Sequence, residues 1–279
     1  MRRVILSGPS LVARWGLAVA AVVAFAFGSA RAQAQQSRVQ AIRVTVDGAV
    51  GHAGSAVYPA DARLADVALA ADIAPDAYLL GAAWLQPGLR REQVRLQAGL
   101  VYELGAIRRQ AMARGEDILS IRVAAFQAWL AALPVTGRRA PVSLDAARLE
   151  VTPEDNLPVH DGDRLVYPRR PSDIRVVGAV DAPCRLPQVA LQDARAYLRA
   201  CAVSPAADPD TIFVVQPDGA VFAQNIALWN RDAPRPLAPG AWIYVPFDRK
   251  AIAGAADDAF DREVAAFLAT QWPDDGDHP

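Results

Sequence analysis

The stretch Val44-Thr-Val-Asp-Gly-Ala-Val50 is repeated in outline as Arg175-Val-Val-Gly-Ala-Val180. Each copy begins with β-branched residues, ends in Gly-Ala-Val, and is completed far downstream by a proline, a turn glycine and an alternating aromatic and β-branched strand. These closing stretches are Pro158-Val-His-Asp-Gly-Asp-Arg-Leu-Val-Tyr-Pro168 and Pro236-Leu-Ala-Pro-Gly-Ala-Trp-Ile-Tyr-Val-Pro246. The paired strand-like segments indicate a duplicated module.

The two copies differ in length, and the difference predicts an insertion. From Gly48 to Gly162 the first copy is about 50 residues longer than the second copy is between its equivalent glycines. Apolar residues recur at helical spacing from Arg91 to Met112 and again from Glu116 to Leu133. The extra residues, at about 88–134, are therefore expected to form a helical hairpin.

The second helix of this hairpin has apolar residues on two faces, so we expect it to pack against both its partner helix and the body of the protein. A protein-binding surface is the alternative. One face carries Ile118, Ile121, Ala125, Trp129 and Leu133, and the other carries Leu119, Val123, Phe126 and Leu130.

Each copy has the order hairpin, helix and closing strand. In the second copy a strand at Val176–Val180 precedes a strand at Arg185–Val189 and a helix at Leu191–Ala202. A helix that crosses one face of a hairpin, with the last strand entering beside the first, is the layout of a β-grasp domain. The expected fold class is α+β, with two β-grasp domains, an inserted helical hairpin in the first, and a C-terminal amphipathic helix.

The amino terminus has the composition of a secretory signal peptide. A charged start precedes an apolar run from Leu11 to Phe27, and small residues follow, so cleavage is expected after Ala32 or Ala34. The apolar run is shorter than the roughly 20 residues that a membrane-spanning helix needs, which makes an uncleaved anchor the weaker alternative. We therefore expect export to the periplasm, with residues 1–34 as signal peptide and no transmembrane segment after cleavage.

The charge of the exported chain argues against some classes of partner. Cleavage would remove four arginines and no acids, which takes the formal net charge from −1 to −5. Such a chain is not expected to bind nucleic acid or an anionic membrane surface. Neither a metal nor a cofactor is expected, because His52, His160 and His278 stand in separate turns or in the tail without ligand spacing.

Two cysteines occur, Cys184 and Cys201, and both lie in the second copy. In an oxidising compartment an even pair within one small module favours a disulfide, with two buried thiols as the alternative. The chain-entropy model assigns such a bridge about 3 kcal/mol, which is a stabilising role.

Seven short motifs, taken in order, resemble the capsule-biosynthesis GfcC-like family of bacterial periplasmic proteins over essentially the whole exported chain. They are Leu133-Pro-Val-Thr-Gly-Arg138, Val142-Ser-Leu-Asp145, Thr152-Pro-Glu-Asp-Asn156, Ile174-Arg-Val-Val-Gly-Ala-Val180, Val215-Gln-Pro-Asp-Gly219, Leu228-Trp-Asn-Arg231 and Gly240-Ala-Trp-Ile-Tyr-Val-Pro246. The resemblance implies β-grasp domains of the soluble-ligand-binding type, as in polysaccharide export proteins. It also implies a role in capsule or exopolysaccharide assembly and export, without an established catalytic activity. The implied partners are export or assembly proteins of the envelope and capsular polysaccharide.

Repeats and resemblance together divide the exported chain into a first domain at 35–172, a second domain at 173–248 and a helix with a polar tail at 249–279. The Cys184/Cys201 pair and the Asp-rich tail depart from the family pattern. The last helix is expected to dock on its own chain or to be a partner-docking helix. Its apolar stripe consists of Phe260, Val264, Phe267 and Leu268.

Three residues are candidates for ligand binding. Arg138 directly follows the inserted hairpin, and its guanidinium could bind a sugar hydroxyl, a uronate or a phosphate, or form a salt bridge that ties the insertion to the domain. Trp229, beside Arg231, is expected to be the most exposed tryptophan and could stack on a sugar ring. Trp242 lies in a strand and is expected to be a core residue.

Catalysis has weaker support in the sequence, and no catalytic residue is assigned. A glycosidase needs two carboxyl groups about 5–10 Å apart. The best candidates, Glu154, Asp155, Asp161 and Asp163, stand in turns, where their side chains are expected to bind the backbone. We therefore expect a non-enzymatic binding protein, with a polysaccharide-modifying enzyme such as a glycosidase as the alternative.

Overall fold

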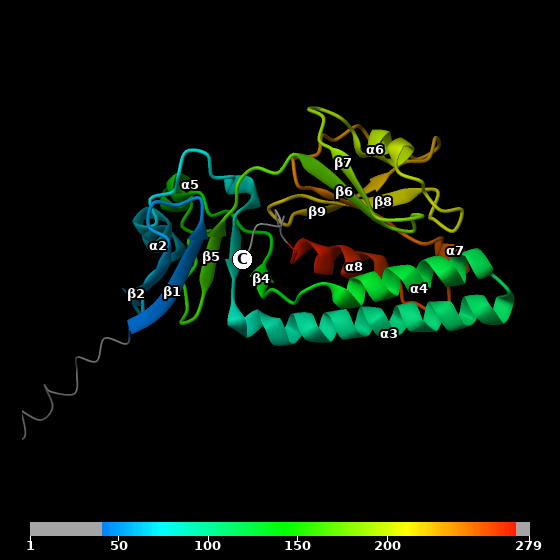
Figure 1. Ribbon diagram of the computed structural model, residues 1–279, viewed down its shortest axis with the longest axis horizontal. Coiled ribbons are helices and arrows are strands. Elements are labelled where there is room, and N and C mark those ends of the chain that lie inside the picture. Colours follow the sequence, from blue (N-terminus) through cyan, green and yellow to red (C-terminus); the bar gives the residue numbers. More distant parts are fainter. Residues whose placement is uncertain (1–40, 272–279) are drawn as a thin grey trace, which may run out of the picture. The chain divides into compact units, whose positions relative to one another are not determined.

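The computed structural model describes residues 41–271 (Figure 1). The signal peptide expected at 1–34 and the polar tail that follows the last helix lie outside these residues. No helix among residues 41–271 is long and apolar enough to cross a membrane.

The first module contains one mixed sheet with the strand order β2-β1-β5-β3-β4, in which β1 and β5 are parallel. The helix α2 (Leu64–Ala70) buries Leu64 and Val67 in the core of this module, and α5 (Ala146–Val151) packs beside it. The strands are β1 (Ala41–Gly48), β2 (Gly54–Pro59), β3 (Ala83–Leu85), β4 (Arg138–Arg139) and β5 (Arg164–Tyr167).

The second module repeats this sheet. Its strand order is β7-β6-β10-β8-β9, again with the first and last strands parallel, so each strand of one module has a counterpart at the same place in the other. The strands are β6 (Asp173–Gly178), β7 (Cys184–Pro187), β8 (Thr211–Val215), β9 (Val221–Asn225) and β10 (Trp242–Val245). The expected α+β class with two β-grasp sheets is confirmed.

Gly48 and Gly178 end the equivalent strands β1 and β6, and both need to be glycine. Their φ angles are 96° and 105°, in the left-handed region. A Cβ on either residue would lie 2.1 Å from a carbonyl oxygen of the parallel partner strand, that of Tyr167 or Val245. The repeated Gly-Ala-Val thus marks a place where only a residue without a side chain fits.

The helix of the second module is shorter than the sequence predicts. It is α6 (Ala194–Ala200), and the Asp193 side chain caps it by accepting a hydrogen bond from the Arg195 amide. Leu191, which was expected to begin this helix, has a φ of 62° and is 85% exposed. The prediction for Leu191 is wrong because the helix begins after the Asp193 cap.

The insertion is the expected hairpin of α3 (Arg90–Arg114) and α4 (Asp117–Ala132), with Gly115 in the left-handed conformation between them. Of the two apolar faces of α4, the one with Leu119, Val123, Phe126 and Leu130 is buried. On the other face, Ile118 and Ile121 are 53% and 60% exposed. Only one of the two faces is therefore fully used for packing within the chain.

Although the hairpin is inserted between strands β3 and β4 of the first module, it shares a core with the second. Phe126 of α4 stacks on Tyr244 of β10 with 5.7 Å between ring centroids, and its ring meets that of Phe247 at 6.0 Å. The rings of Trp129 and Trp242 lie 5.9 Å apart. The two modules are therefore connected through the insertion as well as through the chain between them.

The C-terminal helix α8 (Phe260–Ala269) follows the short α7 (Arg249–Ile252) and docks on its own chain. Figure 1 shows α8 between the sheet of the second module and the α3/α4 hairpin, and α8 contacts both β8 and α3. All of its stripe is buried, so this face is not available to a partner. The side chains concerned are Phe260, Val264, Phe267 and Leu268.

Asp261, in the first turn of α8, is only 7% exposed and accepts a hydrogen bond from the Tyr244 hydroxyl at 2.9 Å. Burial raises the pKa of Asp261 from 3.8 to about 6, and nearby Asp208 adds to the rise, whereas the Tyr244 hydrogen bond and the charge of Arg249 oppose it. The folded chain therefore keeps this proton at a pH where the unfolded chain has lost it.

We expect this carboxyl group to lower the stability of the protein as pH rises. Between about pH 4 and 6 the unfolded state releases the proton first, so the free energy of unfolding falls by about 3 kcal/mol, and the contribution is fully present only below pH 4. An Asp261→Asn variant lacks this fall, so its stability relative to the wild type should rise from pH 4.5 to pH 7.5 in urea unfolding. An equal difference at both pH values would contradict the prediction.

Candidate functional site

Three hollows converge on the turn at Pro217–Gly219, where the two modules meet. The first, the junction pocket, has a volume of about 360 Å³. The second, the Arg138 cleft, has a volume of about 790 Å³ and shares Pro141 with the junction pocket. The third, the Tyr78 cleft, has a volume of about 580 Å³ and shares Leu80 and Asp218 with it. Volumes of roughly 300–1,000 Å³ are typical of small-ligand sites.

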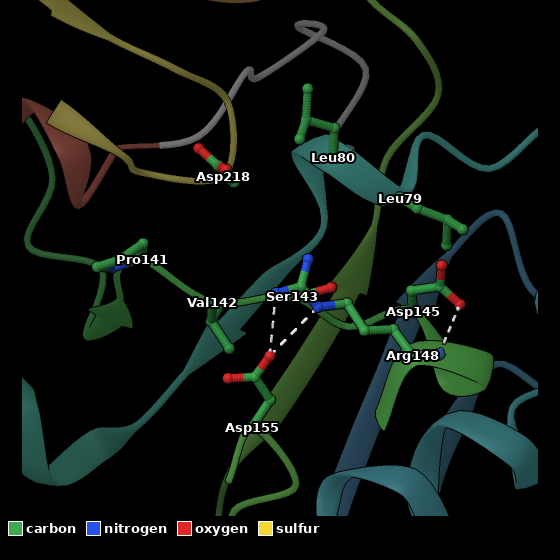
Figure 2. A pocket seen from close by; sticks show the side chains of 9 residues that line it. All are labelled: Leu79, Leu80, Pro141, Val142, Ser143, Asp145, Arg148, Asp155 and Asp218. Atoms are coloured by element: carbon green, nitrogen blue, oxygen red, sulfur yellow. Dashed lines mark hydrogen bonds and ion pairs between the residues drawn. The ribbon is translucent and has the colours of Figure 1, made fainter. Parts of the chain in front are cut away.

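Both modules contribute to the junction pocket, as Figure 2 shows. Asp218 enters from the turn between β8 and β9, whereas the other lining residues come from the first module. Half-exposed apolar side chains stand beside polar ones in this lining. The residues are Leu79, Leu80, Pro141, Val142, Ser143, Asp145, Arg148, Asp155 and Asp218.

Each carboxylate of this pocket is held in place through one of its oxygens. Asp145 caps α5 by accepting hydrogen bonds at Oδ1 from the amides of Ala147 at 3.0 Å and of Arg148 at 3.4 Å. Asp155 accepts at Oδ2 from the Arg148 guanidinium at 3.2 Å. Asp218 accepts at Oδ1 from the Ala220 amide at 2.9 Å. The protein thus orients all three acidic side chains, Asp155 through an ion pair with an exposed arginine.

Arg138 lines the neighbouring cleft but is only 2% exposed. One guanidinium nitrogen donates to the carbonyls of Gln271 at 2.6 Å and Ala269 at 3.4 Å; the other donates to those of Pro217 and, at 3.5 Å, Ala82. Burial lowers the pKa of Arg138 to about 10, and the charge of Asp218 opposes this.

This arginine therefore ties together strand β4, the end of α8 and the turn of the second module. Neither sequence hypothesis describes this arrangement, because the partners are backbone carbonyls and the described residues place no carboxylate in an ion pair with Arg138. A ligand role for Arg138 now requires an approach to a guanidinium whose two terminal nitrogens already have acceptors.

Trp229 and Arg231 lie elsewhere, on the loop that follows β9. Trp229 is 77% exposed, its indole nitrogen donates to Asp210 at 3.2 Å, and the adjoining Leu228 is also exposed. Arg231 is exposed as well. Neither Trp229 nor Arg231 lines the Arg138 cleft, so the three candidate binding residues belong to two separate surfaces.

The cysteine pair forms the expected bridge. Cys184 of β7 and Cys201 at the end of α6 are joined by a disulfide that spans 17 positions of sequence. Cys201 is buried in the core of the second module, so the bridge holds the helix against its hairpin.

The carboxylates considered for a glycosidase do not form one group. Asp163 is buried and accepts hydrogen bonds from the Trp84 indole and the His160 amide, both at 2.9 Å, and burial raises its pKa. Asp161 accepts from the Arg43 amide at 2.8 Å. Asp155 alone of the four lines the junction pocket. Among residues 41–271, no three His, Cys, Asp or Glu side chains are placed to hold a metal ion.

Sequence reasoning missed Asp145 and Asp218 as members of one site. Both occur in motifs that carry the family resemblance, Val142–Asp145 and Val215–Gly219. Their separation of more than 70 positions gave no sign that they meet at one pocket, because the turn of the second module reaches the first only in the folded protein.

Comparison with known proteins finds a family model and a curated protein to which this chain is similar. The family described as "Capsule biosynthesis GfcC C-terminal" matches residues 182–273, which begin just before β7 and include α8. The uncharacterized protein YjbG of Escherichia coli (strain K12) is 26% identical over 197 residues, a span that covers 70% of this chain and 79% of YjbG.

Proposed function

We propose that the protein is a non-enzymatic accessory factor of capsule or exopolysaccharide assembly and export, since the family match at residues 182–273 and the YjbG relative support the resemblance to the capsule-biosynthesis GfcC-like family. It acts in the periplasm by binding glycan or envelope proteins. The observation that carries the proposal is the match of residues 182–273, since this part of the chain provides Asp218 of the junction pocket and the exposed Trp229.

Two surfaces support a binding role. The junction pocket combines half-exposed leucines with fixed acceptors, as small-ligand sites commonly do. The loop with Leu228 and Trp229 exposes an aromatic ring that is oriented by Asp210. An aromatic ring held by a hydrogen bond at its edge keeps its face open for stacking.

A third surface supports contact with an envelope protein. On the outer face of α4, Ile118, Ile121 and Ala125 are exposed at helical spacing, although the chain has used the opposite face for its own core. An exposed apolar stripe on a helix favours a protein partner. We assign this stripe to an export or assembly protein, and the glycan to the pocket and the Trp229 loop.

The enzyme alternative has little support from the turn carboxylates that the sequence offered for it. Asp163 is committed to an indole and a backbone amide, and Asp161 to a backbone amide. Asp155 is paired with Arg148. A glycosidase would need two carboxyl groups directed at one bond of a sugar chain.

Removal of the exposed indole should weaken glycan binding without affecting the fold. We expect Trp229→Ala to reduce retention on a gel that carries the host polysaccharide by roughly five- to tenfold, since an aromatic stacking contact contributes about 1 kcal/mol. The free energy of unfolding should change by less than about 0.5 kcal/mol. Tyr102→Ala, which removes another exposed aromatic ring, is the control and should keep full retention. Equal retention of both variants would exclude the Trp229 loop as a glycan contact.

The proposed role can be tested in the producing cell. Deletion of the gene should reduce surface polysaccharide, and the full chain supplied in trans should restore it. A tagged full-length protein should also co-purify with an export or assembly protein of the envelope, and Ile121→Glu should abolish that capture. Unchanged surface polysaccharide after deletion would refute the proposed role.

A further inference from the structure

We infer that the junction pocket binds a sugar unit without negative charge, as one unit of a longer polysaccharide chain. The inference rests on the proposed function, because it specifies which chemistry of glycan that function handles. Three features of the lining support it: the carboxylate oxygens that the protein leaves without a hydrogen bond, the excess of carboxylates over cations, and the exposed apolar side chains beside them.

In each of the three aspartates, one carboxylate oxygen accepts no hydrogen bond from the residues that the structure describes. The protein uses Oδ1 of Asp145, Oδ2 of Asp155 and Oδ1 of Asp218 to fix the side chains. Among residues 41–271 no hydrogen bond reaches the other oxygen of any of them. The pocket therefore presents three fixed acceptors, which suits a ligand rich in hydroxyl donors. Ser143 adds a hydroxyl that can donate or accept.

The charge of the pocket selects against acidic sugars. Three carboxylates face one cation, Arg148, and that guanidinium is already paired with Asp155. The nearby Arg138 directs its terminal nitrogens to backbone carbonyls, and Arg170 lies over the Tyr78 ring in the adjoining cleft. The charge of the buried Arg138 offsets part of the charge of Asp218, but the lining itself has three carboxylates and one cation, so a uronate or a phosphate would meet net like charge there.

The apolar part of the lining fits the rest of a sugar ring. Leu79 and Leu80, at the short helix η1 (Leu79–Gly81), are 37% and 41% exposed, and Pro141 and Val142 belong to the same lining. The C–H face of a pyranose can cover these side chains while the hydroxyl groups on its edge reach the carboxylates. A purely ionic ligand such as a metal ion would leave the apolar wall without a contact.

Further clefts border the junction pocket on two sides. The Tyr78 cleft borders it at Leu80 and Asp218, and the Arg138 cleft borders it at Pro141. A sugar chain that enters through one cleft and leaves through the other would place an internal unit in the pocket. The inferred site is therefore specific for the charge of one unit and does not require a chain end.

The test is a titration of the purified protein, labelled with ¹⁵N, against two sets of tetrasaccharides at millimolar concentration. One set contains neutral tetrasaccharides of glucose, galactose and mannose, and the other is tetragalacturonate. We expect at least one neutral probe to shift the amide signals of Leu80, Ser143 and Asp218, and tetragalacturonate to bind at least tenfold more weakly. Absence of shifts with every neutral probe, or equal binding of tetragalacturonate, would overturn the inference.

Asp218→Asn gives the matched variant. The amide oxygen can still accept from the Ala220 amide, but the second acceptor becomes a donor and one negative charge is lost. We expect about tenfold weaker binding of the neutral probe and stronger binding of tetragalacturonate. Asp258→Asn removes an exposed aspartate outside the pocket and should change neither. Unaltered preference in Asp218→Asn would refute the charge argument.

The same variant separates this inference from the proposed function. If the deleted cell loses surface polysaccharide and Asp218→Asn restores it as fully as the unaltered chain does, the inferred pocket is wrong and the role in assembly stands. If deletion itself changes nothing, the proposed role fails, whereas the titration still reports on the chemistry of the pocket.

Discussion

Arg138→Ala is expected to lower the free energy of unfolding by about 3–5 kcal/mol, which would be among the largest effects of a single substitution in this chain. The guanidinium donates to carbonyls of the first module, the second module and the end of α8. Without it these buried carbonyls lose their donor, each at a cost of about 1–3 kcal/mol, and a cavity remains. Urea unfolding at neutral pH measures the loss.

The adjoining arginine provides the control. Arg139 is exposed and lies over the Trp84 ring at 5.6 Å, so Arg139→Ala should cost no more than about 1 kcal/mol. If Arg138 were chiefly a ligand-binding residue, its alanine variant would keep the stability of the wild type and lose glycan binding instead. That outcome would contradict the role of Arg138 as a connector of the three segments.

Phe267→Ala is expected to cost about 3–5 kcal/mol as well, because the ring is completely buried where α8 lies between the second sheet and the hairpin. Arg262→Ala, on the exposed side of the same helix, should stay within about 0.5 kcal/mol of the wild type. Thermal and urea unfolding of the two variants distinguish the buried face from the exposed one.

The same pair of variants decides between the two sequence hypotheses for the last helix. A partner-docking helix would tolerate Phe267→Ala in the isolated protein and would lose a partner from envelope extracts. A helix that completes the core would lose stability first. Removal of residues 249–279 is therefore a poor test of partner binding, since it would uncover the core of the second module.

Much of the architecture could be predicted because the information is local. The two Gly-Ala-Val stretches report a steric requirement at Gly48 and Gly178, and the spacing of apolar residues reports the hairpin of α3 and α4. The disulfide was predictable because only two cysteines exist and both lie in one module. The start of α6 was missed because the Asp193 cap outweighs the apolar spacing that includes Leu191.

The candidate site was predicted less well. Trp229 is exposed as expected, whereas Arg138, for which the sequence left a ligand contact or a salt bridge open, donates to backbone carbonyls. Sequence shows that an arginine is present but not which acceptors the fold brings to it. The junction pocket was not predicted, because Asp145 and Asp218 belong to different modules and the sequence does not show that they meet in the folded protein.

The amino-acid sequence by itself determined the duplicated α+β fold, the helical insertion and the cysteine pair, because these depend on residue types at short and regular spacing. Only the tertiary structure decided that the insertion packs on the second module, that α8 is covered by its own chain, and that Asp145 and Asp218 share a pocket. Each of these depends on which apolar surfaces pack against each other. An amphipathic pattern predicts that one face of a helix is buried, but it does not identify the surface that covers this face.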